Sequence, residues 1–84
     1  MNKLNQEQKR RLVSVLNECL DNNSVRSMAK RLNLSVGYIS QISNNKIEII
    51  EREALVICQG LGINPYYILE ESMPKYQNWE EAFM

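Results

Sequence analysis

The 84-residue chain has no histidine, two cysteines, two prolines and three glycines. Without histidine, Cys19 and Cys58 cannot complete a zinc site of the kind that cysteine and histidine ligands build together, so we expect no metal. Histidine is also the commonest general acid or base, and the sequence has neither a glycine-rich phosphate loop nor a nucleophile next to a plausible base. These absences argue against an enzyme and against a bound cofactor.

Long apolar runs are absent as well. No stretch of about 18 apolar residues predicts a membrane span, and no basic segment followed by an apolar one predicts a secretory signal. We therefore expect a cytoplasmic protein in which Cys19 and Cys58 are buried free thiols on apolar helix faces. Eighty-four residues suffice for one small domain with one core. Met1 and the self-contained helices favour a complete small protein.

The formal net charge is zero, but the charges are unevenly distributed. Residues 1–47 hold eight Lys and Arg against three acidic residues, a net charge of +5. Residues 48–84 hold two Lys and Arg against seven acidic residues, a net charge of −5. A basic first half favours an anionic partner such as nucleic acid. Ordinary solvated helix faces produce such a split as well, so the choice of partner depends on the motifs.

Apolar residues recur every three to four positions, which predicts an all-α chain of five short helices. Asn5 and Gln8 can form a capping box, so the first helix is expected to begin after Asn5 and to end near residue 21. Serine caps start the next two helices, which are expected at 24–32 and 35–44.

A fourth helix is expected from about Ile50 to Gly60, and a fifth begins near Pro65, because proline suits the first turn of a helix. The fourth helix and the residue after it are predicted to bury Ala54, Leu55, Ile57, Cys58 and Leu61. We assign residues 1–72 to one domain and residues 73–84 to a short C-terminal tail. The aromatic side chains of the tail are expected to pack on the domain or on a partner chain.

The helices at 24–32 and 35–44 are joined by a tight Asn-Leu connection. Ala29 is small enough to let the second helix cross close to the first. Such a pair is typical of the helix-turn-helix motif, whose second helix lies in the major groove of DNA with its first residues on base edges. The pattern therefore predicts a DNA-reading helix at 35–44.

The residues from Ser24 to Leu69 resemble the Cro and phage-repressor (Xre-type) DNA-binding family. The stretch "MAKRLNLSVGYISQISNNK" resembles the second and third helices of that family, and "ALVICQGLGINPYYIL" resembles its fourth and fifth. The resemblance implies a compact five-helix lambda-repressor-like helix-turn-helix domain. It also implies a sequence-specific transcriptional regulator, a repressor of bacterial or phage type, which we expect to bind a two-fold symmetric operator in double-stranded DNA as a homodimer.

The resemblance further implies which side chains touch DNA. Predicted base contacts come from Val36, Gly37, Ser40 and Gln41. Gln41 can bond to adenine N6 and N7 together, Val36 can meet a thymine methyl, and Gly37 lets the helix backbone approach closely. Predicted backbone contacts, which fix register without reading sequence, come from Arg26, Lys30, Arg31, Ser35, Tyr38, Asn44 and Lys46.

Some of these residues also have structural interpretations. Tyr38 either bonds to a phosphate or lies over the surface of the second helix. Lys30 and Arg31 either bind phosphate or belong to a solvated face. Ile39 and Ile42 are expected in the core rather than at a partner.

Three departures from the family pattern bear on these predictions. Val25 replaces a glutamine that frequently binds phosphate in the family. Asn33 and Asn45 replace glycines, which is tolerable because asparagine adopts the left-handed backbone region more readily than other non-glycine residues. The segment "KIEIIERE", residues 46–53, replaces a basic loop, adds glutamates that weaken attraction to DNA, and offers isoleucines as a partner surface.

Two functional hypotheses follow. For a DNA-binding dimer, the contacts between subunits are expected from the isoleucine-rich loop, the fifth helix or the tail, through Ile49, Ile50, Tyr66, Tyr76, Trp79 and Phe83. The alternative is a helix-turn-helix scaffold that recognises a protein, as in an antitoxin, an anti-repressor or an adaptor. The neutral total charge, the acidic second half and the tail aromatics favour this alternative. Replacing Gln41 by alanine separates the two, because only the first requires a change in base preference.

Overall fold

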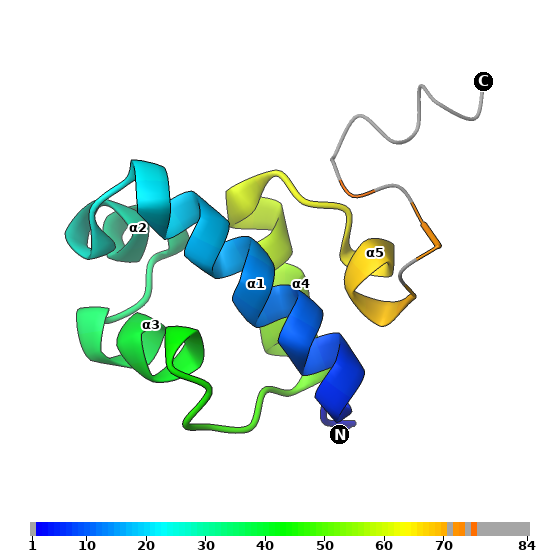
Figure 1. Ribbon diagram of the computed structural model, residues 1–84. Coiled ribbons are helices and arrows are strands. Elements are labelled where there is room, and N and C mark those ends of the chain that lie inside the picture. The colour runs from blue at the N-terminus through cyan, green and yellow to red at the C-terminus, as the bar shows by residue number, and fades with distance from the viewer. Residues whose placement is uncertain (1, 71, 74, 76–84) are drawn as a thin grey trace.

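Five helices make up the regular structure of the computed structural model, which describes residues 2–70, 72–73 and 75 (Figure 1). In chain order they are α1 (Gln6–Asn22), α2 (Val25–Leu32), α3 (Val36–Ser43), α4 (Glu51–Leu61) and α5 (Pro65–Leu69). The described residues contain no β-sheet, so the predicted all-α class with five short helices is confirmed. None of the helices in this part of the chain is long and apolar enough to cross a membrane.

The helices begin where their capping residues predict. The Asn5 side chain accepts a hydrogen bond from the Gln8 N–H at 2.8 Å, and the Gln8 side chain accepts one from the Asn5 N–H at 2.9 Å. This reciprocal capping box starts α1. The Ser24 and Ser35 hydroxyls each accept a backbone N–H at 3.0 Å and start α2 and α3. Local sequence therefore defines these three starts.

Two asparagines end helices in the backbone region that glycine usually occupies. Asn33 follows α2 with φ 57°, and Asn45 lies just beyond α3 with φ 59°. The Leu34 N–H donates to the Ala29 carbonyl at 2.9 Å, which turns the chain sharply between α2 and α3. The predicted tolerance of asparagine at these positions is confirmed.

The core lies between α1 and the other helices. α1 packs against α3, α4 and α5, while α2 packs against α3 and α4. The buried apolar side chains are Leu4, Leu12, Val15, Leu16, Met28, Ala29, Leu32, Ile39, Ile42, Ile49, Ala54, Ile57, Cys58, Leu61, Ile63 and Ile68. Cys58 is buried as predicted, whereas Cys19 is only partly buried, and both are free thiols.

Besides that of Cys19, two predictions about burial are wrong. Leu55 was expected in the core, but its side chain is 46% exposed. Successive helical residues are about 100° apart, so Leu55 points away from the face that Ala54 and Cys58 bury. Ile49 was expected to contact a partner chain, but it is fully buried. A side chain enclosed in this way cannot meet a second subunit without opening the fold.

The N-terminal residues pair with the segment between α3 and α4. Lys3 and Ile50 form an isolated antiparallel bridge. Around it, the Leu4 N–H donates to the Ile49 carbonyl at 2.8 Å, and the Glu51 N–H donates to the Asn2 carbonyl at 2.9 Å. Ile50, the residue before α4, makes no side-chain cap. The Asn2 carbonyl therefore satisfies a donor at the start of α4 that this helix leaves open.

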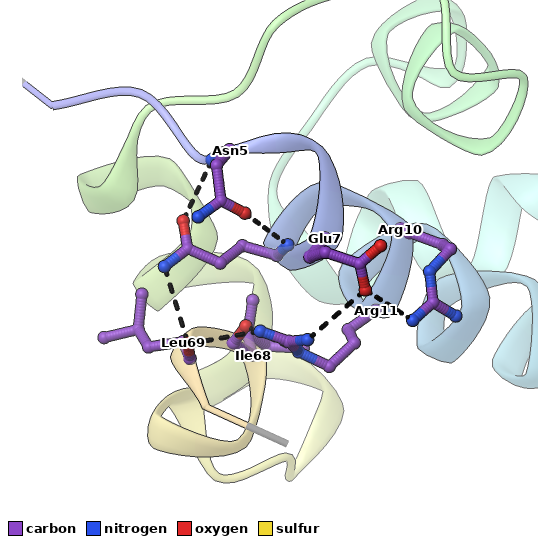
Figure 2. A network of polar contacts seen from close by, with 7 residues as sticks. Asn5, Glu7, Arg10, Arg11, Ile68 and Leu69 are labelled. Atoms are coloured by element: carbon purple, nitrogen blue, oxygen red, sulfur yellow. Dashed lines mark hydrogen bonds and ion pairs between the residues drawn. The ribbon is translucent and has the colours of Figure 1, made fainter.

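A buried arginine joins α1 to the short helix α5, as Figure 2 shows. The Arg11 Nε–H donates to the Ile68 carbonyl at 3.0 Å, and its Nη2 donates to the Leu69 carbonyl at 3.1 Å. Glu7 lies 4.0 Å from Arg11 Nη1 and 2.8 Å from Arg10 Nη2. The Arg11 charge therefore lies inside the fold at the carbonyl end of α5, not on the basic surface.

The described chain beyond α5 returns to α1. The Asn64 N–H donates to the Lys75 carbonyl at 2.9 Å, and Lys75 Nζ lies 2.9 Å from a Glu18 carboxylate oxygen. Lys75 Nζ is also 5.9 Å from the centre of the Tyr67 ring. Contact with the helical body thus continues as far as residue 75.

Candidate nucleic-acid interface

α3 has one face in the core and one in solvent. Ile39 and Ile42 are fully buried. The exposed residues are Val36, Gly37, Ser40, Gln41 and Asn44. Positions separated by three or four residues are neighbours on a helix surface, so these five form one continuous strip, hereafter the α3 strip. All four residues predicted to contact bases belong to it.

Gly37 lies on the α3 strip without any packing reason for a glycine. A β-carbon built at this position has nothing within 4 Å, and its φ is not among the positive values of the described residues. A glycine inside a helix costs about 0.5–1 kcal/mol relative to alanine. The fold therefore carries a small cost at Gly37 that no internal contact explains.

The two ends of the α3 strip differ in how their side chains are held. Val36, at the first position of α3, is 44% exposed. At the other end, Asn44 Nδ2 donates to the Ser40 carbonyl at 2.8 Å, which turns the amide back onto the helix. The exposed Lys46 follows, and its N–H donates to the Gln41 carbonyl at 2.9 Å.

The Tyr38 side chain has partners within the protein. Its hydroxyl contacts the Glu53 carboxylate of α4, and its ring packs against the core. Partial burial, together with the hydrogen bond to Glu53, raises the pKa of Tyr38 to about 12. The hydroxyl is therefore protonated at neutral pH and already has an acceptor, so a phosphate contact from Tyr38 would compete with Glu53.

The cations of α2 fall on two sides of that helix. Arg26 and Lys30 are four residues apart and exposed, so they share one side. Arg31 is exposed as well, but it faces α1. There burial raises the pKa of the Cys19 thiol, and the Arg31 charge acts in the opposite direction. The structure therefore groups Arg26 with Lys30 and separates both from Arg31.

Six cations make no ion pair within the described residues: Lys9, Arg26, Lys30, Arg31, Lys46 and Arg52. Four of these are predicted backbone contacts. Lys9 and Arg52 were missed by the sequence reasoning. Arg52 borders a pocket of about 220 Å³ next to the start of α3, together with Leu34 and Tyr38. Arg52 stands between Glu51 and Glu53 in the first turn of α4, and this acidic surrounding hides it as a candidate in the sequence.

The apolar surface predicted for dimerisation is placed differently by the structure. Ile50 is only partly exposed, and Ile49 is excluded by its burial. Tyr66 is 53% exposed, and the exposed Leu55 and Val56 of α4 provide further apolar area. Tyr76, Trp79 and Phe83 lie outside the described residues.

Figure 1 places α2 and α3 together at the end of the molecule away from α5. The α3 strip and the cations of α2 therefore belong to the same end of the protein. Comparison with protein-family models, with curated proteins and with solved structures finds no match to this chain. The functional argument accordingly depends on the geometry of the described residues and on the sequence pattern.

Proposed function

We propose that this protein is a sequence-specific DNA-binding transcriptional regulator of the lambda-repressor-like helix-turn-helix type, in which α3 enters the major groove. The observation that carries the proposal is the α3 strip, which is exposed along its whole length and contains a glycine that no internal contact requires. A helix backbone that must come close to a second molecule accounts for such a glycine.

The strip suits base recognition. Gln41 is the main reader, because its amide can donate to N7 and accept from N6 of one adenine. Val36 contributes apolar contact to a thymine methyl, and the Ser40 hydroxyl can donate or accept. Gly37 lies between these side chains and lets the backbone reach the floor of the groove.

Charged side chains around the strip hold the DNA backbone. Arg26 and Lys30 approach phosphates from α2, and Lys46 does so beyond the end of α3. Each phosphate neutralised by such a cation releases condensed counterions, so binding weakens steeply as salt increases. Because α3 offers few polar base contacts, we propose that a homodimer pairs two such helices on a two-fold symmetric operator. The exposed Leu55, Val56 and Tyr66 are the described side chains that suit the dimer contact. A protein bound at an operator blocks transcription, so we propose that this protein acts in the cytoplasm as a repressor.

A selection from a random duplex pool, followed by fluorescence anisotropy, tests the proposal. The wild-type protein is expected to enrich one sequence motif and to lose affinity as salt rises. Gln41→Ala should reduce the preference for that motif over a single-base variant by about fivefold or more, because a bidentate base contact is worth about 1–3 kcal/mol of discrimination.

Gln59→Ala is the matched control, since Gln59 is also an exposed glutamine in a helix but lies on α4. This variant should leave the base preference unchanged. If the wild-type protein binds no duplex in a salt-dependent manner, the proposal is wrong.

A second candidate function is recognition of a protein partner by the same scaffold. It is favoured by the large exposed apolar side chains, three of which, Leu55, Val56 and Tyr66, lie on α4 and α5. Under this candidate, Leu55→Ser would abolish partner binding and Gln41→Ala would have no effect on it. Under the DNA proposal, Gln41→Ala has the larger effect.

A further inference from the structure

A groove on the outside of α1 runs up to the end of α3. It has a volume of about 470 Å³ and is lined by Gln6, Glu7, Lys9, Arg10, Val13 and Ser14 of α1 and by Asn45. The α1 residues recur at spacings of three and four, so they form one side of that helix. Asn45 closes the groove from the turn that follows α3.

The groove is held in a fixed place relative to the α3 strip. Asn17 Nδ2 of α1 donates to the carbonyl of Ser43, the last residue of α3, at 3.4 Å. α1 and α3 also pack directly on each other. Asn44 is the last residue of the α3 strip, and the next residue, Asn45, lines the groove. The strip and the groove are therefore adjacent.

All residues that line the groove except Val13 have polar or charged side chains. Lys9 makes no ion pair within the described residues, whereas Arg10 is paired with Glu7 at 2.8 Å. Glu7 is the one acidic side chain among the lining residues. In the segment between α3 and α4, the hydrogen bond and charge of Lys3 lower the pKa of Glu48, and the Lys9 charge lowers it further. Side-chain amides and a hydroxyl supply neutral hydrogen-bond donors along the rest of the groove.

We propose that this groove binds the sugar-phosphate backbone of the duplex beyond the base pairs that α3 reads, with Lys9 as its main cation. The inference rests on the proposed function and extends the contact surface to α1, outside the helix pair α2–α3. A recognition helix in the major groove has a phosphate wall beyond its end. The groove begins next to Asn44 and Asn45. It carries a lysine and neutral hydrogen-bond donors, which are the groups that bind a phosphate backbone.

The test compares Lys9→Gln with the wild-type protein by anisotropy at several salt concentrations, on the duplex enriched by the selection. One phosphate contact changes the slope of log K against log salt by about 0.9 and is worth about fivefold to tenfold in affinity near 0.1 M salt. Lys9→Gln should therefore bind about fivefold to tenfold more weakly, with a slope smaller by about one. Its base preference should be unchanged.

Two further variants test whether the effect of Lys9→Gln is specific to the groove. Glu7→Gln removes the acidic lining residue and should strengthen binding, an effect opposite in sign to that of Lys9→Gln. Lys75→Gln removes one positive charge next to α5 and Glu18, far along the chain from the groove, and should leave the slope unchanged. Thermal melts of all variants verify that they are folded at the assay temperature.

Duplex length supplies the last comparison. On a duplex trimmed to the base pairs of the selected motif, the wild-type protein and Lys9→Gln should bind equally, because the flanking phosphates are gone. If Lys9→Gln matches the wild-type protein on the long duplex while Gln41→Ala still alters base preference, the groove inference is wrong and the DNA proposal stands. If no duplex is bound at all, both are wrong.

Discussion

Arg11 carries a permanent charge into a nearly enclosed position at the junction of α1 and α5. Its guanidinium donates to the carbonyls of Ile68 and Leu69, which a helix end leaves without partners inside the helix (Figure 2). A positive charge at the carbonyl end of a helix is also favourable for the helix dipole. α5 has only five residues, so much of its stability comes from contacts of this kind rather than from its own hydrogen bonds.

Arg11→Met should therefore lower the free energy of unfolding by about 2–3 kcal/mol, because hydrogen bonds to a charged group contribute about 1.5–3 kcal/mol and their loss leaves the buried Ile68 carbonyl without this donor. Urea denaturation monitored by circular dichroism measures this change in the free energy of unfolding. Arg10→Met is the matched control. Arg10 is the adjacent residue of the same type and lies on the surface, so its replacement should have a much smaller effect. Equal effects from the two variants would contradict the role of Arg11.

At the scale of the helices, α3 and α4 each contain a glycine, and the two differ in their surroundings. A β-carbon at Gly37 of α3 would meet open space, whereas one at Gly60 of α4 would lie 2.2 Å from Cδ2 of Leu32. Leu32 is buried, so its methyl group can move only by disturbing the core. Gly60 therefore allows the close approach of α2 to α4, while Gly37 serves nothing inside the protein.

The same substitution should consequently have opposite effects at the two positions. Gly37→Ala should raise the free energy of unfolding by about 0.5–1 kcal/mol through helix propensity, and should weaken binding to the selected duplex. Gly60→Ala should lower the free energy of unfolding by about 1 kcal/mol, because overpacking in a core costs more than the gain in propensity. Thermal and urea denaturation of both variants provide the comparison. A loss of stability in Gly37→Ala would show that the glycine has a structural role.

Helix starts and ends were predictable because their causes are local. Asn5 with Gln8, and the asparagines at 33 and 45, act within a few residues of their own position. Leu55 and Ile49 were predicted wrongly because their burial depends on which neighbour covers each face, and periodicity places a side chain on a helix without saying how wide the covered face is. The role of Arg11 was not predictable either, since its partners lie more than fifty residues away.

For the candidate site, the exposed face of α3 was predictable from the sequence. Every predicted base-contacting residue is exposed on α3, because the spacing of Ile39 and Ile42 already fixes which side is buried. The surroundings were not predictable. The use of the Tyr38 hydroxyl by Glu53 and the position of Lys9 beside Asn45 both depend on how α4 and α1 pack against α3.

For the whole molecule, folding preserves the split between a basic first half and an acidic second half. Ion pairs join Lys3 to Glu48 and Glu18 to Lys75, each across that division. The unpaired cations of the described residues, apart from Arg52, all come from the first half. Lys3–Glu48 neutralises a cation of the first half and Glu18–Lys75 neutralises an anion of it, so the net charge of +5 is unchanged. The unpaired cations of that half lie on α1, α2 and the turn after α3.

The two thiols report on the opening of the whole molecule. Burial raises the pKa of Cys58 to about 12, so this thiol is both protonated and enclosed, whereas Cys19 is partly exposed. A thiol reagent should label Cys19 in the native state, and Cys58 only when the fold opens. The Cys58 labelling rate in Cys19→Ser should therefore increase with urea in step with the unfolding equilibrium. Rapid labelling of Cys58 without denaturant would show that the core opens locally.

The antiparallel bridge near the N-terminus has a consequence for how the chain is made. As with the packing of α1 on α3, α4 and α5, Asn2 and Leu4 find their backbone partners far along the chain, at Glu51 and Ile49. On the ribosome, the earliest residues to emerge must wait until about fifty more have followed before α4 gains its missing acceptor. A fusion partner placed before Asn2 would lie beside the start of α4. A change at the N-terminus would therefore affect a helix in the middle of the chain.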